Sequence, residues 1–301
     1  MIYAIGETVM DILFKEDKPI DAVPGGSAFN SIISVGRTGR ACAFIGYTGK
    51  DHVGALTTKF LRENGVGVEW FEEREGVKSC VSLAFLDEKG DAHYVFYKDT
   101  PQAPDGGEDN IPRFGKDDTL LFGSYYAVCR GTRGQVRKVL EAARAAGATI
   151  YYDINFRSSH KDELQELMPA IEENCRLATV VRGSADDFDV MWGMRNAREI
   201  YERHIAQHCE IFICTAGEGQ ITVCTPDGVW EFEAPHVEHV VSTVGAGDSF
   251  NAGFLCALAE ESEKKMHWSR ERLKPLIERG TSYAAEVCQS TNNYIDVQKN
   301  G

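Results

Sequence analysis

The sequence predicts an α/β fold in which a mostly parallel β-sheet is covered by helices on both faces. Short apolar segments, which fit buried strands, alternate along most of the 301 residues with longer segments of helical periodicity. Glycines and polar turn residues separate the two kinds of segment. Such alternation is typical of parallel sheets, because the crossover between two parallel strands usually runs through a helix on one face.

The first part of the chain contains two strand–helix pairs. Residues 1–5 are expected to form a short apolar strand, and residues 29–39 a helix that ends at a glycine. Residues 41–45 are expected to form a second buried strand, and residues 53–64 a second helix. Asp51 is expected to cap this second helix, because a carboxylate at that place can accept hydrogen bonds from the first free N–H groups.

Residues 79–97 follow a different pattern. Apolar and polar residues alternate, and an Asp-Glu-Lys-Gly turn lies in the middle, which predicts an antiparallel hairpin with one solvated face. Residues 13–23 could pair with this hairpin. We therefore expect a small β lid, formed by about residues 13–23 and 74–102, on a single domain that spans residues 1–301.

The rest of the chain returns to the strand–helix alternation. The expected strands are residues 119–122, 149–153, 178–181 and 211–215, followed by a hairpin over 221–232, and the expected helices are residues 134–146, 161–174, 247–260 and 270–288. In sheets of this kind, ligands bind beyond the carboxyl ends of the strands. Polar motifs that follow predicted strands are therefore the candidate site residues.

Composition narrows the classes of ligand. The chain carries 46 acidic and 32 basic residues, a formal net charge of −14, so its field repels nucleic acid and anionic membranes. No apolar run approaches the ~20 residues that span a bilayer. The nine cysteines include no C-x-x-C pair, which argues against a zinc site and a disulfide framework. We therefore expect a cytoplasmic protein with a small-molecule ligand, and neither nucleic acid nor a membrane as partner.

The strongest chemical signal is S-T-V-G-A-G-D-S-F at residues 242–250. The small residues Gly245, Ala246 and Gly247 let backbone N–H groups converge at a helix start, where the helix dipole also favours an anion. Asp248 would then lie beside the anion, where it could accept the proton of an attacking hydroxyl. Taken alone, the motif equally fits an ordinary helix start with an acidic residue in its first turn.

Two further motifs carry side chains suited to a polar ligand. In P-G-G-S-A-F-N, Gly25 and Gly26 allow close approach of the backbone, and Asn30 offers both a donor and an acceptor. An ordinary glycine turn explains this motif as well. In D-I-N-F-R at residues 153–157, Asn155 and Arg157 are expected on the same side of an extended segment as the aspartate. Arg157 could donate to a substrate or a phosphate, or form a surface ion pair.

Together and in this order, the motifs resemble those of the PfkB (ribokinase-like) carbohydrate kinases, and most of all the fructokinases. The resemblance implies a three-layer ribokinase-like fold, ATP as phosphoryl donor and Mg²⁺ as its cation. It implies that Asp248 is the catalytic base and that residues 245–247 form the anion hole. It also implies that Asp11 binds sugar hydroxyls, together with Gly25, Gly26 and Asn30, and that Lys98 takes the place of an arginine before the substrate pocket.

The resemblance also suggests a nucleotide side of the site. Ser184 and Asp187 fall where the family has N-x-x-E, which organises magnesium and phosphates through water, so Asp187 would be a weak, indirect metal ligand. The loop with Thr215, Gly217 and Gly219 resembles the family's nucleotide loop, shortened by one residue. Ser242 replaces an aspartate that helps to bind a monovalent cation in many members, so the resemblance does not extend to such a cation.

The predicted reaction is ATP-dependent phosphorylation of a sugar hydroxyl, with fructose as the first candidate and fructose 6-phosphate as product. A 2-keto-3-deoxygluconate kinase or another PfkB sugar kinase is the near alternative. A non-catalytic sugar or nucleotide sensor on the same fold also stays open, because Ser242, Ser184 and Asp187 depart from the family pattern. A dehydrogenase lacks support, since no dinucleotide glycine fingerprint follows the first strand. The flat lid could pair across a homodimer.

Overall fold

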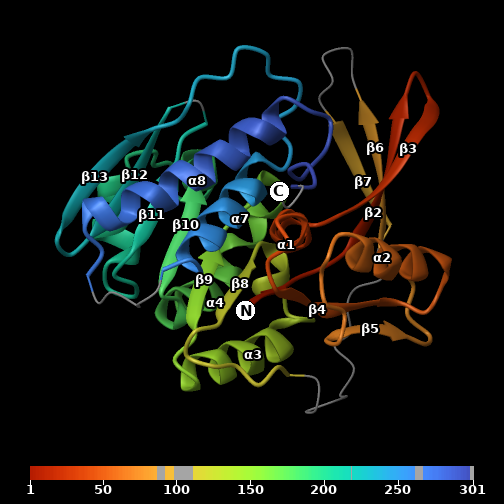
Figure 1. Cartoon of the computed structure of the whole chain (residues 1–301), viewed down its shortest axis with the longest axis horizontal. Helices are drawn as coiled ribbons and strands as arrows, with labels where there is room; N and C mark the ends of the chain where they lie inside the picture. Colours follow the sequence, from red (N-terminus) through yellow and green to blue (C-terminus); the bar gives the residue numbers. More distant parts are fainter. Residues whose placement is uncertain (87–91, 98–110, 218, 262–266, 299–301) are drawn as a thin grey trace.

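The computed structural model describes residues 1–86, 92–97, 111–217, 219–261 and 267–298 (Figure 1). Within these ranges, strands and helices alternate as the sequence predicts. No helix among these residues is both long and apolar enough to cross a membrane.

A large central sheet runs through the molecule. In the described part of the chain it has nine strands in the order β13-β12-β11-β10-β9-β8-β1-β4-β5. The bounds are β1 (Ile2–Ile5), β4 (Cys42–Gly49), β5 (Phe71–Arg74), β8 (Thr119–Gly123), β9 (Thr149–Asp153), β10 (Val180–Ser184), β11 (Phe212–Thr215), β12 (Gln220–Thr225) and β13 (Gly228–Glu233). The strands from β5 to β11 pair in parallel, and the β12–β13 hairpin is antiparallel.

Helices cover both faces of this sheet (Figure 1). One face packs against α1 (Ser27–Arg37), α2 (His52–Glu63), α7 (Ala246–Leu258) and α8 (Arg270–Cys288). The other packs against α3 (Arg133–Ala145), α4 (Leu164–Leu177), α5 (Ala185–Trp192), α6 (Ala197–Ile200) and the short helical turns η1 (Tyr125–Ala127) and η3 (Tyr201–Ile205). A further turn, η2 (Ser158–Glu163), precedes α4 and has no buried residues. Neighbouring strand residues alternate between the two cores: Tyr151 faces the first and Tyr152 the second.

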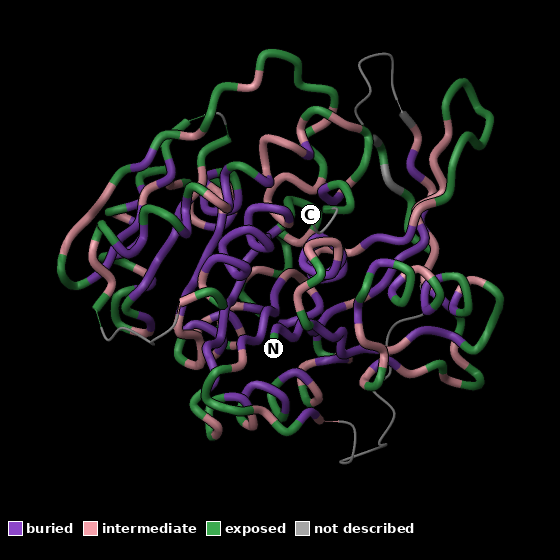
Figure 2. The backbone as a smooth tube through the Cα atoms, viewed as in Figure 1, coloured by how far each residue is buried: buried purple, intermediate pink, exposed green. Residues whose placement is uncertain are grey.

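A second, smaller sheet lies beside the central one. It consists of β2 (Val9–Lys15), β3 (Lys18–Gly25), β6 (Val81–Leu86) and β7 (Ala92–Tyr97), in the order β3-β2-β6-β7. Strands β6 and β7 form the antiparallel hairpin expected from the alternating pattern, and β2 pairs with β6 in parallel. Figure 2 shows that β3 is largely exposed. We refer to these four strands as the small sheet.

Several boundaries differ from the sequence-based expectation. The second strand continues from the predicted Ile45 to Gly49, because Gly46 to Gly49 pair with β5, a strand the hydrophobic pattern did not reveal. The helix predicted over residues 161–174 is divided into η2 and α4. The predicted cap of α2 is confirmed, since the Asp51 side chain accepts from the backbone N–H of Gly54 at 2.9 Å.

The topology locates the site. The chain runs from β1 outward to β4 and β5, then returns to β8 on the opposite side of β1. The direction of winding therefore reverses between β1 and β8, and ligands of open α/β sheets bind at the carboxyl ends of strands at such a reversal. The chain enters the small sheet from this side of the central sheet, because β2 follows the carboxyl end of β1 and β6 follows that of β5.

Candidate active site

The start of α7 is built from very small residues. Gly245 precedes the helix with a φ of 81°, and a Cβ there would lie 2.4 Å from the carbonyl oxygen of Asn293. Only glycine fits without strain or clash. A helix start of this kind offers unpaired N–H groups and the positive end of the helix dipole. The N–H of Ala246 donates to the carbonyl oxygen of Thr243 at 3.3 Å. That Gly245, Ala246 and Gly247 form an anion hole stays a prediction.

Asp248 lies in the first turn of α7 and is held by two donors from the start of α1. Ser27 Oγ donates to its Oδ1 at 2.8 Å, and Asn30 Nδ2 donates to its Oδ2 at 2.9 Å. Burial raises the pKa of Asp248 to about 6, although both hydrogen bonds oppose the rise. The residue is still partly accessible. A carboxylate with these properties can take a proton from a hydroxyl near neutral pH.

Gly25, Asp11 and Asn30 lie around one small space close to Asp248. A Cβ at Gly25 would lie 2.8 Å from Asp11 Oδ2 and 3.8 Å from Asn30 Oδ1. Asn30 Oδ1 is buried and has no hydrogen-bond partner among the residues described. Asp11 accepts a hydrogen bond from Ser82 Oγ, and burial raises the pKa of Asp11. Two acceptors that share a space suit a ligand with several hydroxyl groups.

Gly26 has a backbone role next to this space. Its φ is 126°, and a Cβ there would lie 2.4 Å from the carbonyl oxygen of Glu7. The residue turns the chain from β3 into α1. This turn places Ser27 and Asn30 against Asp248, so the two adjacent glycines act in different ways: Gly25 leaves space and Gly26 sets the direction of the helix.

The structure adds a residue that the sequence analysis left out. Arg182 in β10 is buried, and its Nη1 lies 3.1 Å from Asp153 Oδ1 in the neighbouring strand β9. Its Nη2 donates to Thr215 Oγ1 at 2.7 Å. Asp153 also accepts from Asn251 Nδ2 at 2.7 Å, which connects the end of β9 to α7. The sequence could have pointed to Arg182, because an arginine directly after the buried apolar pair Val180 and Val181 is itself expected to be buried, and charged residues are rarely buried without a partner.

The expectation for residues 153–157 was wrong in its geometry. Strand β9 ends at Asp153, and Asn155 has a φ of 39°, in the left-handed region. The period-two alternation therefore stops, and Asp153, Asn155 and Arg157 do not share one side of an extended segment. Asp153 lies against α7, whereas Asn155 and Arg157 line a separate pocket.

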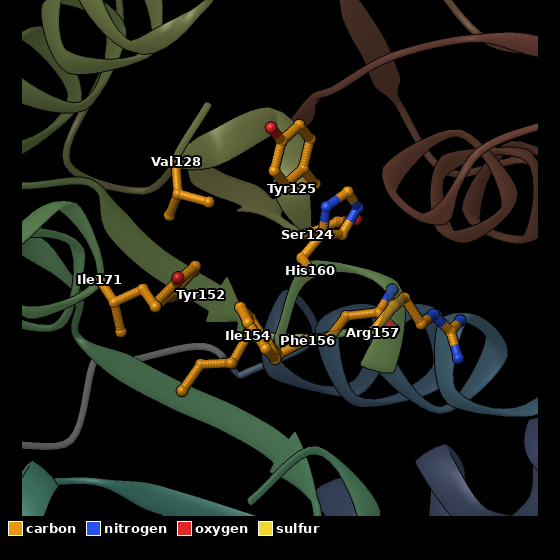
Figure 3. A pocket seen from close by; sticks show the side chains of 10 residues that line it. Ser124, Tyr125, Val128, Tyr152, Ile154, Phe156, Arg157, His160 and Ile171 are labelled. Carbon is orange, nitrogen blue, oxygen red and sulfur yellow. The ribbon is translucent and has the colours of Figure 1, made fainter. Parts of the chain in front are cut away.

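This pocket lies at the carboxyl ends of β8 and β9 (Figure 3). The ring of Tyr125 stacks on His160 with centroids 3.8 Å apart, and the Tyr125 hydroxyl donates to Glu163 at 2.8 Å. The side chain of Arg157 extends away from these rings (Figure 3). The space measures about 10 Å³, which admits a water molecule but no sugar. Arg157 is exposed, and its charge favours the ionised form of Asp248.

Comparison with known families identifies the chain. Residues 1–300 match the family described as pfkB family carbohydrate kinase. The chain belongs to this family. It is therefore a carbohydrate kinase, a phosphotransferase that phosphorylates a sugar, as the motifs predicted.

Two curated relatives of this kinase have different substrates in their names. It is 27% identical over 264 residues to the aminoimidazole riboside kinase of Salmonella typhimurium, which covers 86% of this chain and 81% of that protein. It is 27% identical over 260 residues to a fructokinase of Escherichia coli, which covers 86% of this chain and 84% of that protein. The predicted family is thus confirmed, and the two relatives are equally similar.

Solved structures confirm the ribokinase-like fold. The fructokinase of Vibrio cholerae with fructose, ADP and calcium bound superposes with a TM-score of 0.85 at 21% identity, covering 97% of this chain and 94% of that one. The aminoimidazole riboside kinase of Salmonella enterica, complexed with its riboside and an ATP analogue, gives a TM-score of 0.83 at 23% identity, covering 99% and 96%. The predicted architecture extends along the whole kinase.

The residues predicted for the nucleotide side of the kinase have local roles that the structure makes visible. Ser184 and Asp187 form a capping box on α5: Ser184 Oγ accepts from the Asp187 N–H at 3.1 Å, and Asp187 Oδ2 accepts from the Ser184 N–H at 2.7 Å. Burial raises the pKa of Asp187. Thr215 holds Arg182, and Gly217 turns with a φ of 56°. A nucleotide role for these residues and for Gly219 stays a prediction.

Two further predictions concern Lys98 and the metal ion. Lys98, predicted to bind substrate, lies outside the described residues. Within the described ranges, no group of three or more His, Cys, Asp and Glu side chains could hold a metal ion.

Proposed function

We propose that this kinase transfers the γ-phosphoryl group of ATP to a hydroxyl of fructose, giving fructose 6-phosphate. The single observation that carries the proposal is the arrangement around Asp248. Its carboxylate accepts hydrogen bonds from Ser27 and Asn30 and follows directly after the small residues at the start of α7. The acceptors Asp11 and Asn30 lie around a space next to it. A base, an anion site and a hydroxyl-binding space are what phosphoryl transfer to a sugar requires.

In the proposed reaction, Asp248 takes the proton of the sugar hydroxyl as that oxygen bonds to the γ-phosphorus. The bond to the β,γ-bridging oxygen breaks, and ADP leaves with the electron pair. The backbone N–H groups around Gly245 to Gly247 face the charge that spreads over the γ-phosphate oxygens. A base with a pKa of about 6 is ionised at neutral pH and still basic enough to accept the proton as it is released.

The sugar would be oriented by the acceptors on its other side. A buried, unpaired acceptor such as Asn30 Oδ1 costs about 1–3 kcal/mol. A sugar hydroxyl that donates to it removes this cost, so the interaction favours a ligand with a hydroxyl at that place. Asp11 next to Gly25 offers a second acceptor. The small sheet is proposed as the lid that closes over the sugar, and a homodimer through this lid stays part of the proposal.

Magnesium is proposed to enter with ATP. It would neutralise charge on the transferring phosphates. Because the described residues contain no cluster of metal ligands, the phosphates and water would supply most of its coordination. Asp187, at the position of the glutamate in the family's N-x-x-E motif, would contact the magnesium ion only indirectly, through water. The structure of the Vibrio cholerae fructokinase has fructose, ADP and a calcium ion bound, which supports the use of a divalent cation.

A second substrate has specific support. The relative that acts on aminoimidazole riboside is as similar to this chain as the fructokinases are. A riboside and fructofuranose both present a primary hydroxyl on a five-membered ring, so the base and anion site would serve either. The two ligands differ in the rest of the molecule, because the riboside carries an aminoimidazole ring that fructose lacks. The small sheet would have to accommodate this ring.

A substrate panel tests the proposal. ADP release is measured with Mg-ATP and fructose, aminoimidazole riboside, 2-keto-3-deoxygluconate, ribose or tagatose. The highest kcat/KM is expected with fructose. Turnover restricted to aminoimidazole riboside would contradict the choice of sugar and keep the kinase chemistry. ATP binding without turnover of any sugar would contradict the proposed reaction and favour a sensor.

A further inference from the structure

The surroundings of Arg182 are unusual for a charged side chain. Its side chain is only 7% exposed, and that of Asp153, its ion-pair partner, is 3% exposed. The two residues lie directly opposite each other in the parallel pair of β9 and β10. A buried ion pair often stabilises a fold no better than apolar residues of the same size would, because both charges lose their hydration. A buried pair beside a candidate site therefore calls for a functional explanation.

The guanidinium lies against the anion hole. A Cβ at Gly247 would lie 3.1 Å from both Nη1 and Nη2 of Arg182, so the guanidinium occupies the space that a side chain at this position would need. The same group lies 5.7 Å from the ring centroid of Phe250, one turn further along α7. Arg182 thus fixes how closely the first turn of α7 approaches the carboxyl ends of β9, β10 and β11.

The positive charge of Arg182 lies next to the start of α7 and is compensated by the carboxylate of Asp153. The N-terminal end of a helix carries a partial positive charge, and a cation next to it is repelled. Burial lowers the pKa of Arg182, but Asp153, Tyr151 and Asp187 together raise it above its ordinary value and keep the guanidinium charged. Arg182 Nε is buried and has no partner among the described residues. This fixed positive charge would also stabilise a phosphoryl group with growing negative charge at the helix start.

We infer that Arg182, held by Asp153, is a positioning residue for phosphoryl transfer, which sets the backbone of Gly247 and provides a fixed positive charge behind the anion hole. The inference rests on the proposed kinase reaction. Arg182 acts through the backbone of α7 and through its field. Asp153 has two functions: it keeps Arg182 in place and, through Asn251, ties the same helix to the end of β9.

The pair is also coupled to the proposed base. The groups that face Asp248 are Ser27 and Asn30 from α1, Asp153 from the end of β9 and Arg157 beyond it. The charge of Asp153 raises the pKa of Asp248, whereas Arg157 lowers it. Removing the charge of Arg182 would leave Asp153 without its neutralising partner. We then expect Asp248 to be protonated at higher pH.

The test uses Arg182→Met, Arg182→Lys and the double variant Arg182→Met/Asp153→Asn. Measurements are kcat and KM for the active sugar, ADP affinity, the pH profile of kcat/KM and the thermal midpoint. Arg182→Met is expected to lower kcat roughly 10- to 100-fold, somewhat less than loss of a direct donor, with little change in ADP affinity. Its acidic limb should move to higher pH, and Arg182→Lys should restore part of kcat.

The double variant separates positioning from stability. It removes both buried charges, and Asn at 153 can still accept from Asn251. We expect its thermal midpoint to recover towards wild type and its acidic limb to move below that of wild type, while kcat stays low. Recovery of kcat together with the midpoint would overturn the inference and leave only a structural role. Absence of sugar turnover in the wild type would instead overturn the proposed function, and with it the inference.

Discussion

Asn30 donates its side-chain amide to Asp248 at 2.9 Å, although 218 positions separate the two residues in the sequence. The contact joins the start of α1, which follows the small sheet, to the start of α7, which carries the proposed anion hole. The amide oxygen of the same Asn30 is left buried and unpaired. In the proposed reaction, one side chain would orient the base with its nitrogen and the sugar with its oxygen, which would couple substrate binding to the geometry of proton transfer.

Replacing Asp248 with Asn tests the base. The amide keeps the size of the side chain but accepts a proton far less readily, so kcat should fall by about 10²- to 10⁴-fold. The KM for sugar should change little if the sugar is held mainly by Asp11 and Asn30. Steady-state kinetics at saturating Mg-ATP give the answer, with circular dichroism to show that the variant is folded. Near-normal turnover would remove Asp248 from the mechanism.

The pH dependence follows from the raised pKa of Asp248, about 6 against an ordinary value of 3.8. Below pH 6 the base is protonated, so kcat/KM should fall with an acidic limb near that value. Between these two values the folded state holds more protons than the unfolded one, so this residue's contribution to stability increases as the pH falls.

Ser27→Ala offers a second test of this pH profile. The substitution removes a hydrogen bond that lowers the pKa of Asp248, so the acidic limb should move to higher pH while the anion hole and Asn30 remain. An unchanged limb would show that the profile reports another group.

The parts of the site that the sequence predicted are those set by local backbone requirements. Gly245 and Gly26 are needed where φ is positive, and Asp248 follows in the first helical turn, so short motifs carry the information. Arg182 could not be assigned in this way. Its role depends on the register that places it opposite Asp153 and on the approach of α7 from the distant end of the chain.

Two other misses have equally physical reasons. The predicted extended segment ends at Asn155 because this residue adopts a left-handed conformation. Asparagine tolerates this conformation, but its presence in a sequence does not predict it. The short strand β5 contains Glu72, Glu73 and Arg74, whose charges hide the pattern of a buried strand. At the edge of the central sheet only Phe71 needs to be buried, so pairing with β4 sets the strand.

Gly25→Ala should weaken sugar binding selectively. The new Cβ would lie 2.8 Å from Asp11 Oδ2 and enter the space shared with Asn30, so Asp11 must move or the sugar must be displaced. We expect a KM for sugar at least about tenfold higher, equivalent to about 1.4 kcal/mol, with the KM for ATP nearly unchanged. Gly134→Ala is the control, because a Cβ there meets nothing within 4 Å. Equal effects of the two substitutions on sugar KM would contradict the assignment.

Ser79→Ala tests how the small sheet is anchored. Ser79 precedes β6, and its Oγ donates to Asp51 Oδ1 at 2.7 Å and accepts from the Gly49 N–H at 3.1 Å. Because these partners are buried or partly buried, loss of the hydroxyl should cost about 1–3 kcal/mol of unfolding free energy. Urea unfolding measures it, with Ser282→Ala on the exposed side of α8 as the control, expected within about 0.5 kcal/mol of wild type. If the junction also fixes how the small sheet meets the site, the KM for sugar should rise in Ser79→Ala alone. A purely structural junction would lower the urea midpoint and leave that KM unchanged.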